Sequence, residues 1–568
     1  MSERVLRGVA AAAGIALGAA LVYRPESPGG GAERAAGSPE QERARFEVAL
    51  LQGEAQLDAL AATADQQGQE ILQAHKMMLQ DPELHSLVEQ GVAAGKSADA
   101  AVSEAIDQFA AMLESLGDEY LRERAADVRD VGRRLLAALS GRTIGLKLQK
   151  PSVVVARDLA PTDTLGLDRS LLLGLVTEQG GPTSHTSILA RSWGVPAVVA
   201  VAGLLQAAEE GMAVALDGTA GEVVLAPDPA TRERYQGKLA EARAQAERDQ
   251  AEAGLPAQTP DGHRVELAAN AGSPDEVAHA MEKGAEGVGL LRSEFLFMGR
   301  GSAPDEEEQY RAYAAALTNA KGHRVIIRTL DIGGDKDLPY LSIPKEENPF
   351  LGVRALRLCF RRPELFRTQL RALLRASVHG KLAIMFPMVG GLQELRQAKA
   401  ALAEAQRSLE AEGKAVAPHE VGIMIEIPSA ALVAAHLAKE VDFFSIGTND
   451  LVQYTLAVDR GNPDLADMYQ PYHPAVLNLI DQVIRAAHGE SKWVGVCGEM
   501  GGLPGGALLL LGLGIDELSM SPSLLASIRR LVRSTTFAEA RAVAEQSLAM
   551  GTPEEVHALV EPFLIRAK

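Results

Sequence analysis

The sequence is poor in cysteine and has no excess of positive charge. Only Cys359 and Cys497 occur among its 568 residues, too few and too far apart for a disulfide framework or a cysteine-rich zinc site. This scarcity predicts a reducing compartment, which we interpret as the cytoplasm. The 56 lysines and arginines are outnumbered by 75 aspartates and glutamates, which gives a net charge of −19. Such a balance disfavours nonspecific binding to nucleic acid and suits a basic partner.

The sequence also lacks an apolar run long enough to span a bilayer. Its nearest approach is at residues 8–23, which follow Arg4 and Arg7 as the apolar part of a signal peptide would. Gly14 and Gly18 interrupt that run. We therefore predict no membrane insertion and interpret the run as a strand, a turn and a strand of a folded domain. A secretory signal peptide is the alternative.

A polar turn, Gly-Gly-Pro-Thr-Ser-His-Thr-Ser at residues 180–187, separates an apolar run from a helix-like one. Its glycines permit unusual backbone angles, and Thr186 and Ser187 are predicted to cap the helix that follows. The N–H groups of a helix start attract anions. His185, held there, can offer one ring nitrogen as a nucleophile toward a phosphoryl group. The alternative is a capped turn whose histidine is merely exposed.

Short β-like runs surround this turn, at residues 152–156, 171–176, 195–201 and 212–225. With the N-terminal strands they predict a compact α/β domain built from residues 1–25 and 143–228. The polar helix predicted at 229–256 suits a semi-rigid connector to the rest of the chain.

Residues 33–140, which interrupt that domain, are helical in pattern and begin in a linker-like stretch at 26–39. Asp81-Pro82 marks one helix start, with the aspartate as N-cap, and about four helices fit the segment. We find no polar cluster of catalytic spacing in it and predict an inserted module for binding or, alternatively, for structure. His75 and His85 are interpreted as surface histidines rather than ligands.

Residues 257–568 alternate short apolar runs with helical stretches. Eight such repeats predict a (β/α)8 barrel, and a doubly wound open sheet is the alternative. The runs lie at residues 265–269, 287–291, 325–328, 382–386, 421–427, 443–446, 493–497 and 518–520.

Polar residues follow several of these runs where each run ends. Because the carboxyl ends of barrel strands meet at one mouth, Arg292, Arg328 and Arg460 are expected near two carboxylates. Arginine binds phosphate and carboxylate oxygens bidentately. Glu426 and Asp450 offer hard oxygen ligands to a magnesium ion, whose octahedron substrate and water would complete. The pattern predicts a site for a small phosphorylated, carboxylated anion; for each residue taken singly, an ordinary ion pair is the alternative.

Cys497 ends the seventh run and is expected at the same mouth. An inert buried thiol is the usual interpretation of a lone cysteine. The functional alternative is a proton donor, because a reaction that expels an enolate needs an acid near the carbon that is protonated. Cys359, in the helix-like run at 354–360, is interpreted as structural.

These motifs resemble Enzyme I of the bacterial phosphotransferase system, the phosphoenolpyruvate-protein phosphotransferases, over nearly the whole chain. Pro182 is a departure, since that family often has arginine or alanine there. The similar stretches are the turn at 180–187, Gly-Leu-Leu-Arg-Ser-Glu-Phe at 289–295, Asp-Ile-Gly-Gly-Asp-Lys at 331–336, Phe-Ser-Ile-Gly-Thr-Asn-Asp-Leu at 444–451, Val-Cys-Gly-Glu at 496–499 and, in the helical segment, Asp118 to Asp130.

The resemblance implies a phosphoryl relay, interpreted as the first general step of sugar uptake; a relay that regulates nitrogen metabolism is the alternative. His185 would accept the phosphoryl group on Nε2 and pass it to a histidine of the carrier protein HPr, which would dock on the helical insertion. Because His185 lies outside the barrel, its domain would swivel about the 229–256 helix. The resemblance also implies a homodimer that associates through the barrel.

For the barrel mouth the resemblance implies one role for each candidate residue. Arg292, Arg328 and Arg460, with Asn449 and the backbone of Asp450, would bind phosphoenolpyruvate. Glu426 and Asp450 would hold Mg²⁺, and Cys497 would protonate the enolate to give pyruvate.

Two other functions are compatible with parts of this pattern. Pyruvate phosphate dikinases and phosphoenolpyruvate synthases resemble the histidine domain and the barrel, but they need an ATP-binding region. The helical segment has no glycine-rich phosphate loop. A non-catalytic phosphorelay scaffold is the second alternative.

Overall fold

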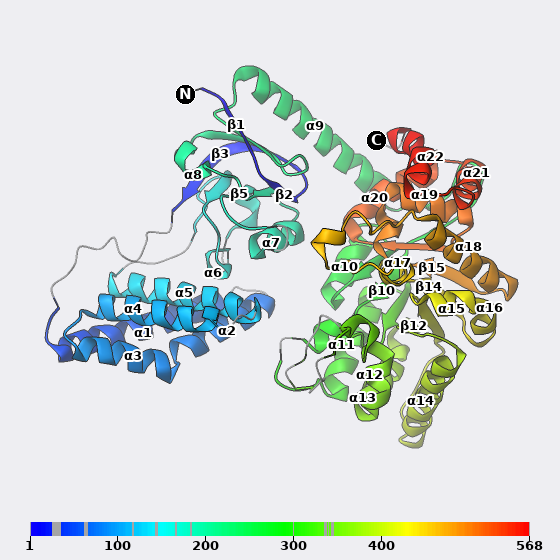
Figure 1. Cartoon of the computed structure of the whole chain (residues 1–568), viewed down its shortest axis with the longest axis horizontal. Helices are drawn as coiled ribbons and strands as arrows, with labels where there is room; N and C mark the ends of the chain where they lie inside the picture. Colours follow the sequence, from blue (N-terminus) through cyan, green and yellow to red (C-terminus); the bar gives the residue numbers. More distant parts are fainter. Residues whose placement is uncertain are drawn as a thin grey trace. The chain divides into compact units, whose positions relative to one another are not determined.

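The computed structural model describes residues 2–24, 36–61, 66–115, 119–141, 146–164, 167–181, 184–298, 300–333, 338, 340–341 and 346–566. The chain divides into two compact units, residues 1–246 and 247–568 (Figure 1). Most of the linker-like stretch predicted at 26–39 lies outside the described residues, as do Asp118, Pro182, Thr183, Gly334, Asp335 and Lys336.

The first unit contains a mixed eight-stranded sheet in the order β1-β8-β7-β3-β4-β5-β6-β2. The N-terminal run is β-structure, as predicted, and β3 pairs in parallel with β4 across the helical segment that separates them in sequence. All five residues of β4 are buried, which suits a valine-rich strand covered on both faces. The strands are β1 (Arg4–Arg7), β2 (Val9–Ala12), β3 (Ile15–Tyr23), β4 (Ser152–Ala156), β5 (Leu172–Thr177), β6 (Ala197–Val199), β7 (Ala213–Asp217) and β8 (Glu222–Leu225).

The helices of this unit fall into an all-helical segment and a set that accompanies the sheet. Asp81 caps α3 as predicted, since its Oδ1 accepts a hydrogen bond from the N–H of Glu83 at 2.8 Å. His75 is buried, with 1% of its surface exposed, so its interpretation as a surface histidine is wrong. The helices are α1 (Pro39–Ala61), α2 (Gln66–Leu79), α3 (Pro82–Ala93), α4 (Ala98–Ser115), α5 (Glu119–Leu139), α6 (Pro161–Thr164), α7 (His185–Trp193), α8 (Leu204–Ala207) and α9 (Pro229–Glu252), which continues into the second unit.

The second unit is a closed barrel of eight parallel strands, each followed by helical structure. The barrel prediction is confirmed and the open-sheet alternative is wrong. The strands are β9 (Glu266–Ala271), β10 (Gly287–Leu291), β11 (Arg324–Arg328), β12 (Lys381–Phe386), β13 (Glu420–Ile425), β14 (Phe443–Ile446), β15 (Trp493–Val496) and β16 (Glu517–Met520).

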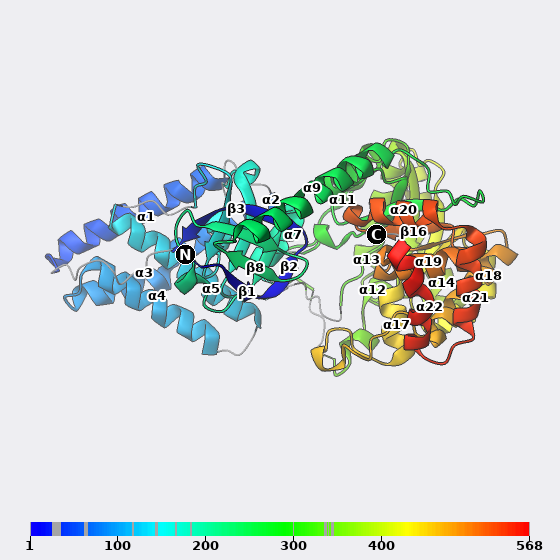
Figure 2. The ribbon, with the colours of Figure 1, turned by 90° about the horizontal axis from the view of Figure 1, so that it is seen from above.

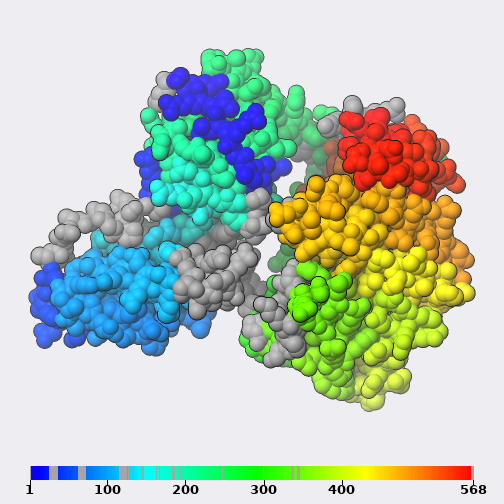
Figure 3. Space-filling view, in the orientation of Figure 1, coloured from blue at the N-terminus to red at the C-terminus, as the bar shows by residue number. Residues whose placement is uncertain are grey.

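Helices surround this barrel, and the last ones in the chain extend the ring. Helix α19 packs against α20, α21 and α22, and these helices lie together in both ribbon views (Figures 1 and 2). On the face shown in Figure 3, the green, yellow, orange and red segments of this unit form one continuously packed body. The helices are α10 (Pro274–Glu282), α11 (Glu306–Asn319), α12 (Ala355–Arg361), α13 (Pro363–Ala376), α14 (Leu392–Ala411), α15 (Pro428–Leu432), α16 (Ala434–Leu437), α17 (Thr448–Leu456), α18 (Pro474–Gly489), α19 (Pro504–Leu513), α20 (Leu525–Ser534), α21 (Phe537–Leu548) and α22 (Pro553–Arg566).

Among the helices that the structure describes, none is long and apolar enough to cross a membrane.

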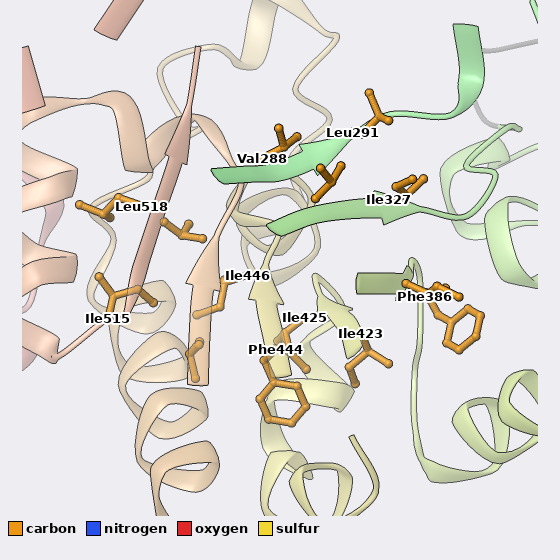
Figure 4. Packing of buried hydrophobic residues seen from close by; sticks show 14 of the residues in the cluster. Val288, Leu291, Ile327, Phe386, Ile423, Ile425, Phe444, Ile446, Ile515 and Leu518 are labelled. Atoms are coloured by element: carbon orange, nitrogen blue, oxygen red, sulfur yellow. The ribbon is translucent and has the colours of Figure 1, made fainter. Parts of the chain in front are cut away.

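Side chains alternate along each barrel strand between the helix-facing core and the barrel interior. Figure 4 shows members of the outer core from several strands, among them Val288, Ile327 and Phe444. A separate apolar cluster fills the interior and includes Met424 and Cys497. The interior is therefore packed mainly with apolar side chains, and the charged groups described below lie at its two ends.

A charged cluster closes the amino end of the barrel, where the strands begin. The Arg324 guanidinium donates to Glu266 Oε2 at 2.9 Å and to Glu517 Oε2 at 3.0 Å, and it lies 3.9 Å from the centre of the Trp493 ring. Burial, together with repulsion from Glu266 and Glu420, raises the pKa of Glu517 to about 7 against the attraction of Arg324. Glu517 therefore keeps its proton in the folded state at pH values where the unfolded chain has lost it.

We predict that Glu517 makes the barrel less stable as pH rises from about 4.5 to about 7. In this window the folded state binds more protons than the unfolded state, so the free energy of unfolding falls with increasing pH. Glu517→Gln should flatten this part of the profile, measured by calorimetric unfolding of the barrel between pH 5 and pH 8. Glu364→Gln, whose side chain is 87% exposed in the native protein, is the control; equal slopes for both variants would contradict the prediction.

Candidate active site

The candidate residues of the barrel lie where its strands end. Arg328 is the last residue of β11, and Arg292, Glu426 and Cys497 directly follow β10, β13 and β15. Asp450 lies in the first turn of α17, just after β14. Because the strands are parallel and the barrel is closed, these positions share one mouth.

Arg328 is held in this mouth by two carboxylates. Its Nη1 lies 2.8 Å from Asp331 Oδ2, and its Nη2 donates to Glu294 Oε1. Burial lowers the pKa of a guanidinium, but Asp331 and Glu294 outweigh it and raise the pKa of Arg328. Arg328 Nε is buried and has no hydrogen-bond partner among the described residues. The side chain thus keeps its charge and one N–H for a ligand.

Arg354 is a second buried arginine, which sequence reasoning missed. Its Nη2 donates to both oxygens of Asp331, at 3.0 and 3.2 Å, and lies 3.6 Å from Asp450 Oδ2. Its Nη1 donates to the Tyr454 hydroxyl at 3.2 Å. The sequence pattern assigned Arg354 to the helix that follows. One feature of the sequence could have identified Arg354 as a site residue. It ends the loop that follows β11, on the side of the barrel where Asp331 lies.

The two predicted metal ligands are buried and lie among these arginines. Glu426 Oε1 accepts a hydrogen bond from the N–H of Met388 at 2.5 Å. Burial, followed by repulsion from Asp450 and Asp331, raises the pKa of Glu426 to about 8. Asp450 Oδ1 is buried without a hydrogen-bond partner in the described part of the chain. Crowded carboxylates with an oxygen that accepts no hydrogen bond suit a bound cation.

The rest of a metal shell would come from outside the protein. Over the residues that the structure describes, no group of three or more histidine, cysteine, aspartate or glutamate side chains is arranged to hold a metal ion. Magnesium keeps several waters and usually takes only one or two carboxylates plus substrate oxygens. Glu426 and Asp450 fit that donor set.

The remaining predicted binding residues form a more exposed rim. Arg460 Nη2 lies 3.7 Å from Asp450 Oδ1 with 36% of its side chain exposed. The Asn449 side chain accepts a hydrogen bond from the N–H of Glu499 at 2.9 Å. Arg292 is exposed, and its backbone N–H donates to Ala271 O at 3.0 Å. The three predicted arginines, Arg292, Arg328 and Arg460, thus lie at the same end of the barrel as Asn449.

Cys497 reaches the mouth from the barrel interior. Only 5% of its surface is exposed, and it packs in the interior cluster with Met424. Burial raises the pKa of its thiol to about 11. The sulfur therefore carries its proton at neutral pH, as a proton donor requires.

His185 belongs to the first unit, where it is the first residue of α7. The prediction that Thr186 and Ser187 cap this helix is wrong, because Ser184 is the N-cap and its Oγ accepts from the N–H of Ser187 at 3.4 Å. Gly180 has a φ of 104°, a conformation that glycine adopts readily. The loop thus places His185 at the amino end of a capped helix, where the helix dipole favours negative charge.

One buried glutamine braces two of the loops that carry arginines. Gln369 of α13 accepts a hydrogen bond from the N–H of Leu330 at 2.9 Å and donates to Ser293 Oγ at 3.1 Å and to the Tyr313 hydroxyl at 3.0 Å. Leu330 follows Arg328 closely, and Ser293 directly follows Arg292. Gln369 is thereby hydrogen-bonded to the backbone close to one predicted binding arginine, Arg328, and to the side chain next to another, Arg292.

Known protein families match the chain in three places. A PEP-utilising enzyme N-terminal model matches residues 7–124, a mobile-domain model matches 148–221, and a PEP-binding-domain model matches 246–537. These segments include most of the helical insertion, the His185 turn and all eight barrel strands.

Whole-length relatives are also found. Phosphoenolpyruvate-protein phosphotransferases of Bacillus sp. (strain S) and Staphylococcus carnosus are 47% and 45% identical, covering 98% of this chain and 98% and 99% of their own length. Among solved structures, an NMR solution structure of an Enzyme I protein covers 42% of this chain and 99% of its own, with 38% identity and a TM-score of 0.37.

We predict that Gln369→Leu lowers the free energy of unfolding of the barrel by about 1–3 kcal/mol, the cost of leaving buried polar groups without a partner. Gln369 is 1% exposed, and leucine has a similar size. Denaturant unfolding of the two proteins measures the difference. Gln397→Leu on exposed α14 surface is the control and should change stability by less than about 0.5 kcal/mol; equal effects would show that Gln369 braces nothing.

Proposed function

The chain belongs to the family of phosphoenolpyruvate-protein phosphotransferases, and from this premise we propose that it moves the phosphoryl group of phosphoenolpyruvate to His185 and on to a carrier histidine. The observation that carries the proposal is the pair of buried arginines, Arg328 and Arg354, each locked by carboxylates in the mouth of the barrel. A ligand with several negative charges is what such a pair can bind.

In the first transfer, the ring Nε2 of His185 attacks phosphorus while the P–O bond to the enol oxygen breaks. Arg292, Arg328, Arg460 and Asn449 bind the phosphate and carboxylate oxygens, with a contribution from the backbone of Asp450. Arginines so placed neutralise charge in a loose phosphoryl-transfer transition state, where positioning supplies most of the rate. Arg354 joins this set because its Nε is buried without a partner among the described residues.

The enolate that leaves must gain a proton on carbon. Cys497 Sγ donates it, pyruvate forms, and the thiolate regains its proton from water. The nearly buried position of Cys497 keeps solvent from competing for that carbon. In the second transfer a histidine of an HPr-type carrier attacks the phosphorus, the N–P bond to His185 breaks, and His185 returns to its starting form.

Glu426 and Asp450 would hold a magnesium ion. When bound, this ion supplies positive charge next to the phosphoryl and carboxylate oxygens.

In this relay His185 must reach first the barrel and then the carrier, because it lies in the first unit whereas the proposed binding residues lie in the second. We propose that the histidine domain, residues 1–25 and 143–228, swivels on the 229–256 helix between the barrel and the carrier. We place the carrier on the helical domain, residues 33–140. Val48, Leu51 and Met77 of its first two helices are large apolar residues that are 53%, 68% and 66% exposed.

The barrel domain, residues 257–568, is also the proposed dimer interface, and exposed Leu351, Leu432 and Met468 are available to it. We assign the protein to the cytoplasm and to the first general step of sugar uptake. An ATP-dependent dikinase and a non-catalytic scaffold are both disfavoured, because transferases named for the same reaction match 98% of the chain.

Phosphoenolpyruvate labelled in its phosphate should transfer an acid-labile label to the protein in the presence of Mg²⁺. His185→Ala should abolish the label, because it removes the attacking nitrogen. His279→Ala, at a side chain that is 59% exposed, is the matched control and should label normally. Chelation of the metal should slow labelling at least about tenfold. Adding purified HPr should move the label to the carrier.

Label that persists in His185→Ala would contradict the assignment of the nucleophile. A wild-type chain that takes up no label in the presence of Mg²⁺ would contradict the proposed activity as a whole.

A further inference from the structure

Three neighbouring strands of the barrel bring three polar groups together beside the mouth. The closed barrel orders them β15-β16-β9. Leu518 and Met520 of β16 face the outer core, so Ser519 between them faces the interior. By the same alternation Asn270 of β9 faces the interior, since Ala269 and Ala271 belong to the outer core. Cys497 lies in the interior cluster at the end of β15.

A chain of hydrogen bonds joins these groups across β16. Ser519 Oγ donates to Asn270 Oδ1 at 2.7 Å, and Asn270 Nδ2 donates to the carbonyl oxygen of Cys497 at 3.0 Å. A carbonyl can only accept, so the amide must present its NH2 group to Cys497 and its oxygen to the serine. The side chain of Asn270 thereby has one orientation rather than two.

The hydrogen bond from Asn270 to the Cys497 carbonyl lies just beyond the last paired residues of β15 and β16. The ladder between β15 and β16 pairs Val496 with Leu518 and goes no further. The N–H of Cys497 still donates to Ile446 O of β14 at 3.1 Å. With Asn270 on the carbonyl, both backbone groups of Cys497 are fixed, and with them the direction of its Cα–Cβ bond.

The sequence leaves room for this arrangement. Ser519 is fully buried, and a Cβ on Gly289 of β10 would come within 2.4 Å of Ser519 Cβ and 2.5 Å of its Oγ. Such distances are far inside van der Waals contact. The absence of a side chain at Gly289 therefore leaves the space in which the Ser519 hydroxyl reaches Asn270.

We propose that Asn270 and Ser519 are positioning residues that aim the Cys497 thiol at one face of the enolate. The proposal rests on the proposed function, in which Cys497 Sγ gives its proton to the methylene carbon. Proton transfer needs the donor within hydrogen-bond reach of its target, and a displacement of about 1 Å can cost about a hundredfold in rate. Without the Asn270 contact the backbone at Cys497 is held on one side only and can shift, and the Cα–Cβ bond and the sulfur shift with it.

The stereochemistry of the product separates this role from a merely structural one. Phosphoenolpyruvate with tritium at one vinyl position, turned over in D2O, gives pyruvate whose methyl group carries H, D and T. Protonation from one side makes a single methyl enantiomer, whereas protonation by solvent after release makes both. Wild type should give one enantiomer, and Asn270→Ala should give a mixture with kcat about tenfold to a hundredfold lower.

Controls distinguish failure of this proposal from failure of the proposed function. All variants should still exchange phosphoryl groups between phosphorylated His185 and the carrier at the wild-type rate, because that step does not need the thiol. Cys497→Ala should give a racemic methyl group; a single enantiomer there would contradict the role of Cys497 itself. Asn319→Ala removes a comparable bond, from Asn319 Nδ2 to Pro274 O at 2.8 Å, and should leave the stereochemistry unchanged.

Ser519→Ala provides a second test if Asn270→Ala fails to fold. It removes one bond to Asn270 and should lower the enantiomeric excess in the same direction, by less. A single methyl enantiomer from whichever of these variants folds, alongside a racemic product from Cys497→Ala, would overturn the proposal.

Discussion

Buried positive charge at the mouth of the barrel is the constraint on which the rest of the site depends. Arg328 and Arg354 are each at most 6% exposed, and removing a guanidinium from water costs several kcal/mol unless carboxylates compensate. Asp331 lies between the two and binds both. Under the proposed function, the arginines are thereby held ready for an anionic ligand without reorganisation when it arrives, which is the condition for electrostatic catalysis.

The described part of the mouth has more buried carboxylates than buried guanidiniums. Among the residues that the structure describes, four buried carboxylates, those of Glu294, Asp331, Glu426 and Asp450, lie near two buried guanidiniums. Burial, followed by repulsion from Asp450 and Asp331, raises the pKa of Glu426, so that a proton relieves part of this crowding; a bound cation would relieve it as well. The opposite end of the barrel carries its own charged cluster around Arg324, so stability and chemistry are assigned to different ends of the same strands.

Much of this could be predicted from the sequence, and the remainder could not for a physical reason. Apolar runs with polar ends identified all eight barrel strands and the residues after them, because strand periodicity and strand ends are local features. Contacts between distant segments leave no local signal. Arg354 reaches the site from a loop, and Gln369 of α13 is hydrogen-bonded to residues beside the site. Asn270 is hydrogen-bonded to Cys497, which lies 227 residues further along the sequence. The N-cap at Ser184 was missed because three neighbouring hydroxyl residues fit the same pattern.

The central claim is that the barrel mouth binds phosphoenolpyruvate through its buried arginines while the nucleophile comes from the other unit. Titration calorimetry of His185→Ala with phosphoenolpyruvate and Mg²⁺ tests it most directly, since this variant can bind but cannot react. The account predicts saturable binding, weakened at least about tenfold when Arg354→Lys is added, because lysine cannot reproduce the forked contacts of arginine. Absence of binding to His185→Ala, or binding indifferent to Arg354→Lys, would contradict the account.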